Sequence, residues 1–187
     1  NQYISYYFKN RLNFSALKTK LSVFRSYFVF GKVLIDKTAI SVGLRNRFTY
    51  EFDGIENIKN LLAEKKGGVL ISAHIGNFEI AEHFFADIDF DAQINLVTTD
   101  QEVTAIREYM ESISVKKSNI KFIFVKDDMS HIFRINEALS NNELICFTGD
   151  RYFEGSKFME ADLLGKTAKF PAGPFLIASR LRVPVVY

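Results

Sequence analysis

The chain has 187 residues and a formal net charge of +2; 48% of its residues are hydrophobic and 25% are charged. This balance is typical of one globular domain with a sizeable core, and it excludes a disordered or fibrous chain. The chain has nineteen Phe and eight Tyr but no Trp. Such a surplus can fill a core, and it also suits a protein that binds an apolar ligand or contacts a membrane. The single cysteine, Cys146, lies in an apolar run, which predicts a buried structural thiol and excludes an internal disulfide framework.

Charge is distributed unevenly along the chain. Residues 1–47 hold nine Lys or Arg against one acid, Asp36, for a net charge of +8, so the remainder carries −6. A basic, aromatic-rich segment on an acidic body suggests an anionic partner surface. Residues 67–78 and Phe170–Ser179 are the longest runs without Asp, Glu, Lys or Arg, twelve and ten residues, and both are short of the roughly 18–20 that a transmembrane helix needs.

Residues 1–30 predict one or two helices. Nine residues, most of them aromatic or aliphatic, recur there at helical spacing with basic residues between them: Tyr3, Tyr6, Tyr7, Asn10, Phe14, Leu17, Leu21, Phe24 and Phe28. The leading interpretation is a helix packed on the domain, and the main alternative is a helix that lies on a membrane surface. Nucleic acid is disfavoured as a partner because no recognised binding motif is present.

Strands and helices alternate from residue 47 onward. Alternating or continuous apolar runs predict strands at 47–52, 69–73, 93–98, 120–125, 144–148 and 183–187. Helical patterns lie between them at 55–65, 77–85, 101–112, 130–139 and 173–181, and a glycine-bearing stretch fills 149–170. The predicted class is α/β, with a mostly parallel central sheet flanked by helices. We expect a basic aromatic helical segment over 1–46 and an α/β domain over 47–187, which ends on an uncovered strand and is expected to continue in the natural protein.

His74 and Glu79 follow the predicted strand 69–73 and form the leading candidate site. On one regular helix these two residues would point about 140° apart, so they meet only if the chain bends between them. Gly76 and Asn77 can supply that bend and a helix N-cap. Glu79 accepting the Nδ1 proton would then orient His74, whose Nε2 could take a proton from a hydroxyl. The alternative is an ordinary structural His–Glu pair.

Several blocks of the sequence resemble one known family. The stretches 54–58 and 67–79, with the pattern His-x4-Glu, resemble the first motif block of the lysophospholipid acyltransferase superfamily, in its bacterial lipid A late acyltransferase branch. The resemblance continues through 149–158 and 164–174 to 183–185, with the blocks in the expected order. It therefore covers roughly residues 47–187.

The resemblance implies an O-acyltransferase at the cytoplasmic face of a bacterial inner membrane. A fatty acyl chain would move from acyl carrier protein or coenzyme A to a hydroxyl of a lipid A-like or other membrane lipid acceptor. His74 would be the general base and Glu79 its orienter, and the acceptor oxygen would attack the thioester without a covalent acyl-enzyme. The acyl thioester is then a substrate, and no bound cofactor or metal is implied.

The later blocks imply substrate contacts. Asp150 and Arg151 match a block near the active site, where Arg151 could bind an acceptor phosphate; a salt bridge within a turn is the alternative. Lys166, Lys169 and Gly173 match positions that contact a phosphate-bearing acceptor or the carrier arm of the donor. One departure is plain: where the lipid A branch tends to carry an arginine, residues 114–132 offer only Lys116, Lys117, Lys121 and Lys126.

Two rival classes of function remain open. The same His–Glu pair could activate water, which would give a thioesterase or lipid hydrolase. Alternatively, the chain could be a non-catalytic, membrane-associated lipid-binding module with a structural His74. The other histidines are weaker candidates: His83 lies too far along its helix, and His131 is expected to be an exposed polar residue. Neither metal-ligand spacing nor a phosphate-binding or dinucleotide-binding glycine motif occurs.

Overall fold

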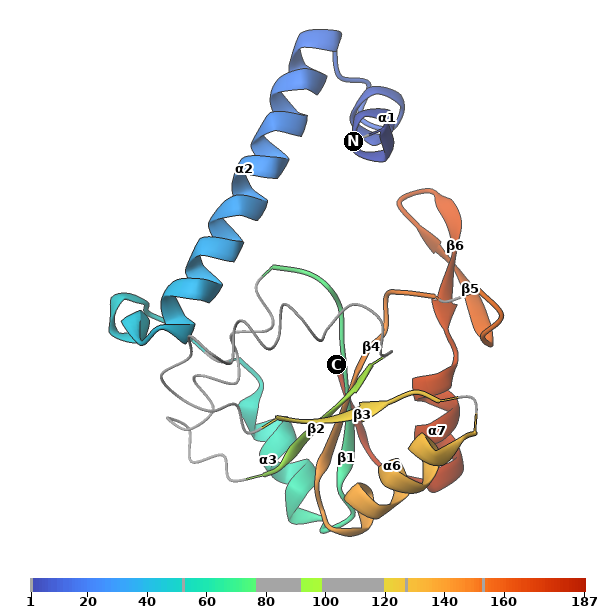
Figure 1. Ribbon diagram of the computed structural model, residues 1–187. Coiled ribbons are helices and arrows are strands. Elements are labelled where there is room, and N and C mark those ends of the chain that lie inside the picture. The colour runs from blue at the N-terminus through green and yellow to red at the C-terminus, as the bar shows by residue number, and fades with distance from the viewer. Residues whose placement is uncertain (1, 52, 77–91, 99–119, 127, 153) are drawn as a thin grey trace.

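The computed structural model describes residues 2–51, 53–76, 92–98, 120–126, 128–152 and 154–187. They form an α/β body and a pair of N-terminal helices that extends away from it (Figure 1). The predicted helices at 77–85 and 101–112 lie outside the described residues. So do five residues named above: Asn77, Glu79, His83, Lys116 and Lys117.

A five-stranded sheet with the order β3-β2-β4-β1-β7 forms the centre of the body. Its strands are β1 (Gly68–Ser72), β2 (Ile94–Thr98), β3 (Ile120–Phe124), β4 (Leu144–Thr148) and β7 (Val185–Val186). Every neighbouring pair is parallel, which confirms the predicted class. All five carboxyl ends therefore lie at one edge of the sheet, where open α/β folds place their ligand sites.

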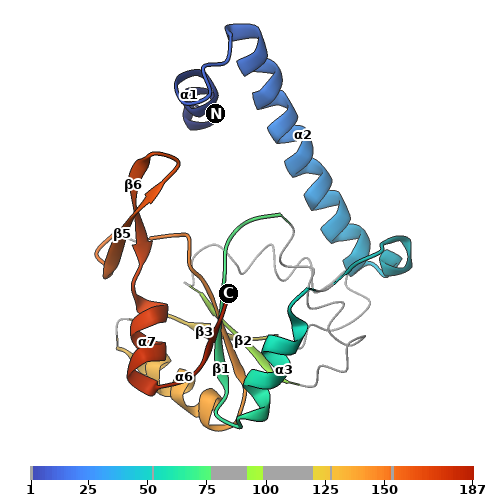
Figure 2. The ribbon, with the colours of Figure 1, turned by 180° about the vertical axis from the view of Figure 1, so that it is seen from behind.

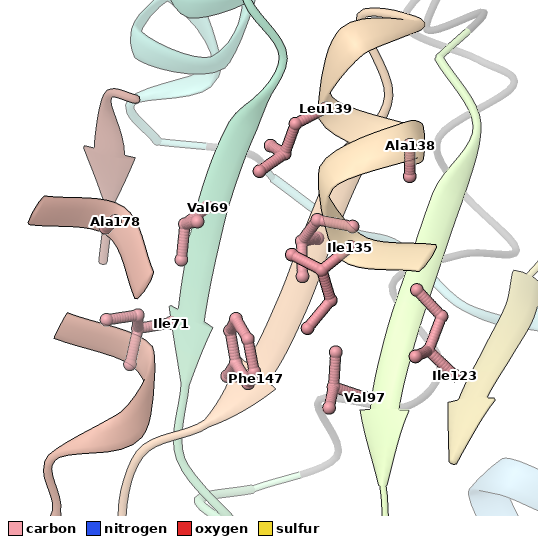
Figure 3. Packing of buried hydrophobic residues seen from close by; sticks show 10 residues of the cluster. Val69, Ile71, Val97, Ile123, Ile135, Ala138, Leu139, Phe147 and Ala178 are labelled. Atoms are coloured by element: carbon pink, nitrogen blue, oxygen red, sulfur yellow. The ribbon is translucent and has the colours of Figure 1, made fainter. Parts of the chain in front are cut away.

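Two helices cover one face of this sheet: α6 (Ser130–Ser140) and α7 (Gly173–Leu181). Figure 3 shows how their side chains meet the inward-facing residues of four strands. The cluster comprises Val69, Ile71, Val97, Ile123, Ile135, Ala138, Leu139, Ile145, Phe147 and Ala178. Val69, Ile135 and Ile145 are completely buried, and Ile71 and Phe147 carry the core toward the carboxyl ends of β1 and β4.

Helix α3 (Ile55–Ala63) covers the opposite face (Figure 2). Its Leu61 packs so closely on Gly68 that a Cβ on that glycine would overlap the leucine side chain. Gly67 turns the chain into β1 with φ +64°, and a Cβ there would lie 2.7 Å from the carbonyl oxygen of Glu143. The paired glycines thus let β1 start directly beneath α3.

Most predicted elements end within one or two residues of the observed ones, but the predicted strand 47–52 is wrong. Leu44–Arg47 form a short 3-10 helix, η1, closed by a hydrogen bond from the Phe48 N–H to the Arg45 carbonyl. Residues 48–51 follow without regular structure. Their alternating pattern forms no strand because no described strand lies beside them to complete a ladder.

The stretch 149–170 contains a β-hairpin that the sequence did not predict. Strands β5 (Phe158–Leu163) and β6 (Lys166–Pro171) pair antiparallel around the two-residue loop Leu164-Gly165. Both loop residues have positive φ, +55° and +76°, as this class of tight hairpin requires.

The N-terminal segment forms two helices, α1 (Gln2–Asn10) and α2 (Ala16–Ser41). The Ser15 side chain caps α2 by accepting a hydrogen bond from the Lys18 N–H at 3.4 Å. The buried residues of α2 are Thr19, Ile40 and Ser41, near its two ends. The leading interpretation, a helix packed on the domain, is therefore wrong for most of α2. Within the described ranges, no helix is both long and apolar enough to cross a membrane.

Candidate active site

The site is built from the ends of two adjacent parallel strands. Ser72 of β1 and Thr148 of β4 are register partners. His74 lies two residues beyond β1 and Asp150 two residues beyond β4, so equal extensions bring both side chains to the same edge of the sheet.

Asp150 holds His74 with both carboxylate oxygens. His74 Nδ1 lies 2.8 Å from Asp150 Oδ1, and the His74 backbone N–H donates to Asp150 Oδ2 at 3.0 Å. The side chains of His74 and Asp150 are 29% and 31% exposed, so the pair is held by the protein yet open to a ligand. By accepting two hydrogen bonds, one carboxylate fixes the ring and the backbone that carries it.

The local sequence allows this close approach. The Ile75 N–H donates to the Ala73 carbonyl at 2.8 Å, which makes a tight bend around His74, and Gly76 then has φ +64°. The sequence predicted a bend at Gly76 and Asn77; the positive φ of Gly76 agrees with its first half, and Asn77 lies outside the described residues. On the other strand, Gly149 precedes Asp150, and a Cβ there would lie 2.6 Å from the Ile71 side chain. Glycine at 149 lets the two chain ends converge.

The pKa of Asp150 is lowered by its contacts with His74. Burial acts to raise the pKa of Asp150, but the hydrogen bonds from the His74 side chain and backbone outweigh it and hold that pKa below its usual 3.8. Asp150 is therefore ionised at neutral pH and can only accept hydrogen bonds. Nδ1 of His74 must carry the proton that it shares with Asp150, and the lone pair of the neutral ring resides on Nε2.

The remaining predicted substrate-binding residues lie outside the contact between His74 and Asp150. Arg151, next to Asp150, is exposed. Lys169, on β6, has its Nζ 4.3 Å from the ring centroid of Phe158 and 5.4 Å from that of Tyr152. Tyr152 is two residues from Asp150 in the chain, so Lys169 packs on the segment that directly follows the site. Tyr152 is a candidate that sequence reasoning missed.

Lys166 lies at the far end of the same hairpin. Its Nζ is 3.5 Å from the Tyr6 hydroxyl of α1, and Arg11 donates to the Gly165 carbonyl at 3.0 Å. An open cavity of about 610 Å³ lies between α1 and the hairpin tip. Gly173 begins α7, directly after β6. The structure thus brings His74 and Asp150 into contact and separates Lys166 from Lys169.

Three further residues discussed in the sequence analysis can be compared with the structure. His131 is buried rather than exposed, because its Nδ1 accepts the Lys126 backbone N–H at 3.2 Å. Lys121 pairs with Glu143, which precedes β4, so this lysine serves the amino edge of the sheet and lies away from the site. Cys146 is buried as predicted, and burial raises the pKa of its thiol to about 12.

The role of Asp150 as the Nδ1 acceptor was not anticipated, since the sequence assigned that role to Glu79 and a substrate contact to Asp150. The predicted role of Glu79 remains a prediction, since that residue is outside the described part of the chain. Asp150 lies two residues beyond β4, as His74 lies two residues beyond β1. This signal could have identified Asp150, but only if β1 and β4 were already known to be neighbours. Among the described residues, no group of three or more His, Cys, Asp or Glu could hold a metal ion.

Comparison with known proteins identifies the family of the chain. The family model for bacterial lipid A biosynthesis acyltransferases matches residues 29–187, which include α2 from Val29 onward and the whole α/β body. A search among curated proteins found no match. With a family model matching most of its length and covering His74 and Asp150, the chain belongs to the bacterial lipid A biosynthesis acyltransferase family.

Proposed function

We propose that the chain transfers a fatty acyl group from a thioester, on acyl carrier protein or coenzyme A, to a hydroxyl of a lipid A-like or other membrane lipid. The observation that carries the proposal is the hydrogen-bonded pair of His74 and Asp150 at the carboxyl edge of a parallel sheet. A histidine that shares its Nδ1 proton with a carboxylate has Nε2 as the ring nitrogen that can take a proton in general base catalysis. The cytoplasmic face of the bacterial inner membrane is the proposed location, because both substrates would meet there.

The reaction balances with the residues of the site. Nε2 of His74 takes the proton of the acceptor hydroxyl, and the hydroxyl oxygen attacks the thioester carbonyl. The tetrahedral intermediate collapses, the C–S bond breaks, and the leaving thiolate takes the proton from His74. Asp150 remains ionised throughout and stabilises the imidazolium that forms in between. Glu79, the predicted partner of His74, is proposed to help hold the His74 ring in this orientation.

Positive charge near the pair would serve the phosphate groups of the substrates. Arg151 is next to Asp150 and offers a planar, bidentate donor set for an acceptor phosphate. Lys169 and Gly173 are proposed to contact the acceptor or the phosphate-bearing arm of the donor. The contact of Lys166 with Tyr6 supports a role for it at the α1 side rather than beside the reacting atoms.

The test is a product analysis with purified protein, an acyl thioester donor and a lipid acceptor. The proposal predicts acylated lipid as the main product, and its loss in His74→Ala. Release of free fatty acid in place of acylated lipid would assign the hydrolase alternative. No turnover of any acyl thioester, with vesicle binding intact, would assign the non-catalytic alternative. Circular dichroism of each variant establishes that it is folded.

A further inference from the structure

The cleft between α1 and the tip of the β5–β6 hairpin lies apart from the reacting pair. It has a volume of about 610 Å³, and its walls come from opposite ends of the chain. Both views show α1 opposite the hairpin tip (Figures 1 and 2). At about 3.3 Å per strand residue, Lys166 at the tip is roughly 10 Å along β6 from Lys169, which packs on the segment after Asp150. The lining residues are Gln2, Tyr6, Tyr7, Arg11, Leu163, Leu164 and Lys166.

Two cations meet in this cleft, and both have neutral partners. Arg11 donates to the Gly165 carbonyl at 3.0 Å, and Lys166 Nζ lies 3.5 Å from the Tyr6 hydroxyl oxygen and 5.0 Å from the centroid of its ring. Gly165 and Lys166 are consecutive, so both charges are held at the same tip. Within the ranges that the structure describes, neither cation forms a salt bridge with a carboxylate.

This arrangement favours an anionic ligand. A guanidinium carries five N–H donors and an ammonium carries three, so the contacts made by the described residues leave most of these donors available. Two like charges that are held close together repel each other, and an anion that bonds both of them removes that repulsion. A phosphate monoester, with a charge of about −1.5 to −2 at neutral pH, matches the two cations in charge.

Leu164 supplies an independent observation at the same place. It is the first residue of the two-residue hairpin loop and has φ +55°, where such loops favour Asn, Asp or Gly. Its side chain lines the cleft and is 64% exposed, so burial within the chain does not offset the unfavourable backbone. Strained backbone of this kind is concentrated where a ligand is bound. With the neighbouring Leu163, 51% exposed, it places an apolar surface beside the two cations.

We propose that this cleft binds a lipid with a phosphate monoester head group. Arg11 and Lys166 bond the phosphate, the guanidinium as a planar fork and the ammonium as a point charge. The hydrocarbon of the lipid lies on Leu163 and Leu164. An inorganic phosphate ion would satisfy the cations but leave the two leucines in water, so it is the poorer match. The inference goes beyond the proposed function, because this site is separate from the reacting pair and needs no acyl transfer to bind its ligand.

Isothermal titration calorimetry of the whole purified chain tests the proposal. The probe is dihexanoyl phosphatidic acid at concentrations where its short chains keep it monomeric, so that no membrane surface is present. Dihexanoyl phosphatidylcholine has the same chains without the monoester, and inorganic phosphate has no chains. We expect phosphatidic acid to bind about tenfold more tightly than either comparison probe. Equal affinity for phosphatidic acid and phosphatidylcholine would overturn the proposal, and so would equal affinity for phosphatidic acid and inorganic phosphate.

Lys166→Gln separates recognition of the phosphate from the shape of the cleft. It should weaken binding of phosphatidic acid by about tenfold and leave the affinity for phosphatidylcholine unchanged, because an amide can still contact the Tyr6 hydroxyl. Arg134→Gln, which removes an exposed cation of α6, is the matched control and should bind as the unaltered chain does. If Lys166→Gln weakened both probes equally, the lysine would only hold the cleft together and the inference would fail.

Leu164→Asn should change stability and binding in opposite directions. Asn tolerates positive φ, so thermal melts followed by circular dichroism should show a higher midpoint. Loss of the apolar contact should weaken binding of phosphatidic acid by about fivefold. A variant that melts higher and binds as tightly as the unaltered chain would show that Leu164 does not contact the ligand, which contradicts the proposal.

Two further variants distinguish this inference from the catalytic proposal. His74→Ala and Arg151→Gln should both bind phosphatidic acid with unaltered affinity, because neither residue lines the cleft. If Arg151→Gln weakened binding and Lys166→Gln did not, the phosphate would lie beside the reacting pair; the inference would fail and the proposed function would stand. Conversely, binding that depends on Lys166 in a chain that transfers no acyl group would support the inference and refute the proposed function.

Discussion

Helix α2 and the α/β body both carry apolar residues at four-residue spacing, and the two regions place them in opposite surroundings. Ile135 and Leu139 of α6 lie four residues apart and are buried on the sheet. Leu17 and Leu21 of α2 lie four residues apart as well, and both are more than 60% exposed. Periodicity therefore identifies a helix and its apolar face, but the surface that covers that face is decided by the rest of the fold or by a partner.

The largest effect should come from the site in the body. His74→Ala removes the proposed base and should lower the rate of acyl transfer by about 10²–10⁴-fold, measured as acylated lipid formed per unit time. His131→Asn is the matched control, because an amide oxygen can still accept the Lys126 N–H. If both variants lose the same activity, the loss reflects damage to the fold and the role of His74 fails.

Matched truncations in the two regions should differ in their cost to stability. Ile145→Ala empties a fully buried position of β4 and should lower the free energy of unfolding by about 2–5 kcal/mol. Leu21→Ala changes an exposed residue of α2 and should cost less than about 0.5 kcal/mol. Urea denaturation in the absence of lipid measures both. Similar losses in the free energy of unfolding would mean that Leu21 and the other exposed apolar residues of α2 are covered in solution.

The charge at Asp150 should affect rate and stability together. Asp150→Asn should slow acyl transfer by about 10²-fold, because the ring loses its charged acceptor, while Asp150→Glu should restore part of the rate.

The folded-state pKa of Asp150 is depressed below 3.8, so the stability it contributes is present above pH 3.8 and is lost as pH falls through the folded pKa. Unfolding of wild type and Asp150→Asn, compared from neutral pH downward, should therefore converge only in acid. A stability difference that persists at a pH well below 3.8 would contradict this account.

Alanine substitutions at two glycines, one in each region, should change stability with opposite signs. Gly67→Ala forces a Cβ against the Glu143 carbonyl at positive φ and should destabilise the body by more than about 1 kcal/mol. Gly31→Ala lies inside α2 with nothing within 4 Å, and should stabilise that helix by about 0.5–1 kcal/mol. Thermal melts followed by circular dichroism distinguish the two. A stabilising Gly67→Ala would show that the close approach at the start of β1 is not required.

Local patterns were sufficient for the parallel sheet and for one half of the site. The apolar runs of β1 and β4 mark strands buried on both faces, and the bend after His74 is signalled by Gly76. The sequence could not place Asp150 on the histidine ring, because that contact depends on which strands are neighbours. The hairpin was missed because β5 and β6 are exposed and lack a buried face. Residues 48–51 show the converse error, an alternating pattern with no strand to pair with.

The central claim is that Asp150 acts through His74, and a double-mutant cycle on the rate of acyl transfer tests it most directly. The four proteins are the unaltered chain, His74→Ala, Asp150→Asn and the double variant, assayed with the same acyl thioester and lipid acceptor. If Asp150 serves to orient the ring, its replacement has no further effect once the ring is gone, so the double variant should be no slower than His74→Ala alone. Multiplied losses in the double variant would contradict the account and assign Asp150 a role independent of His74.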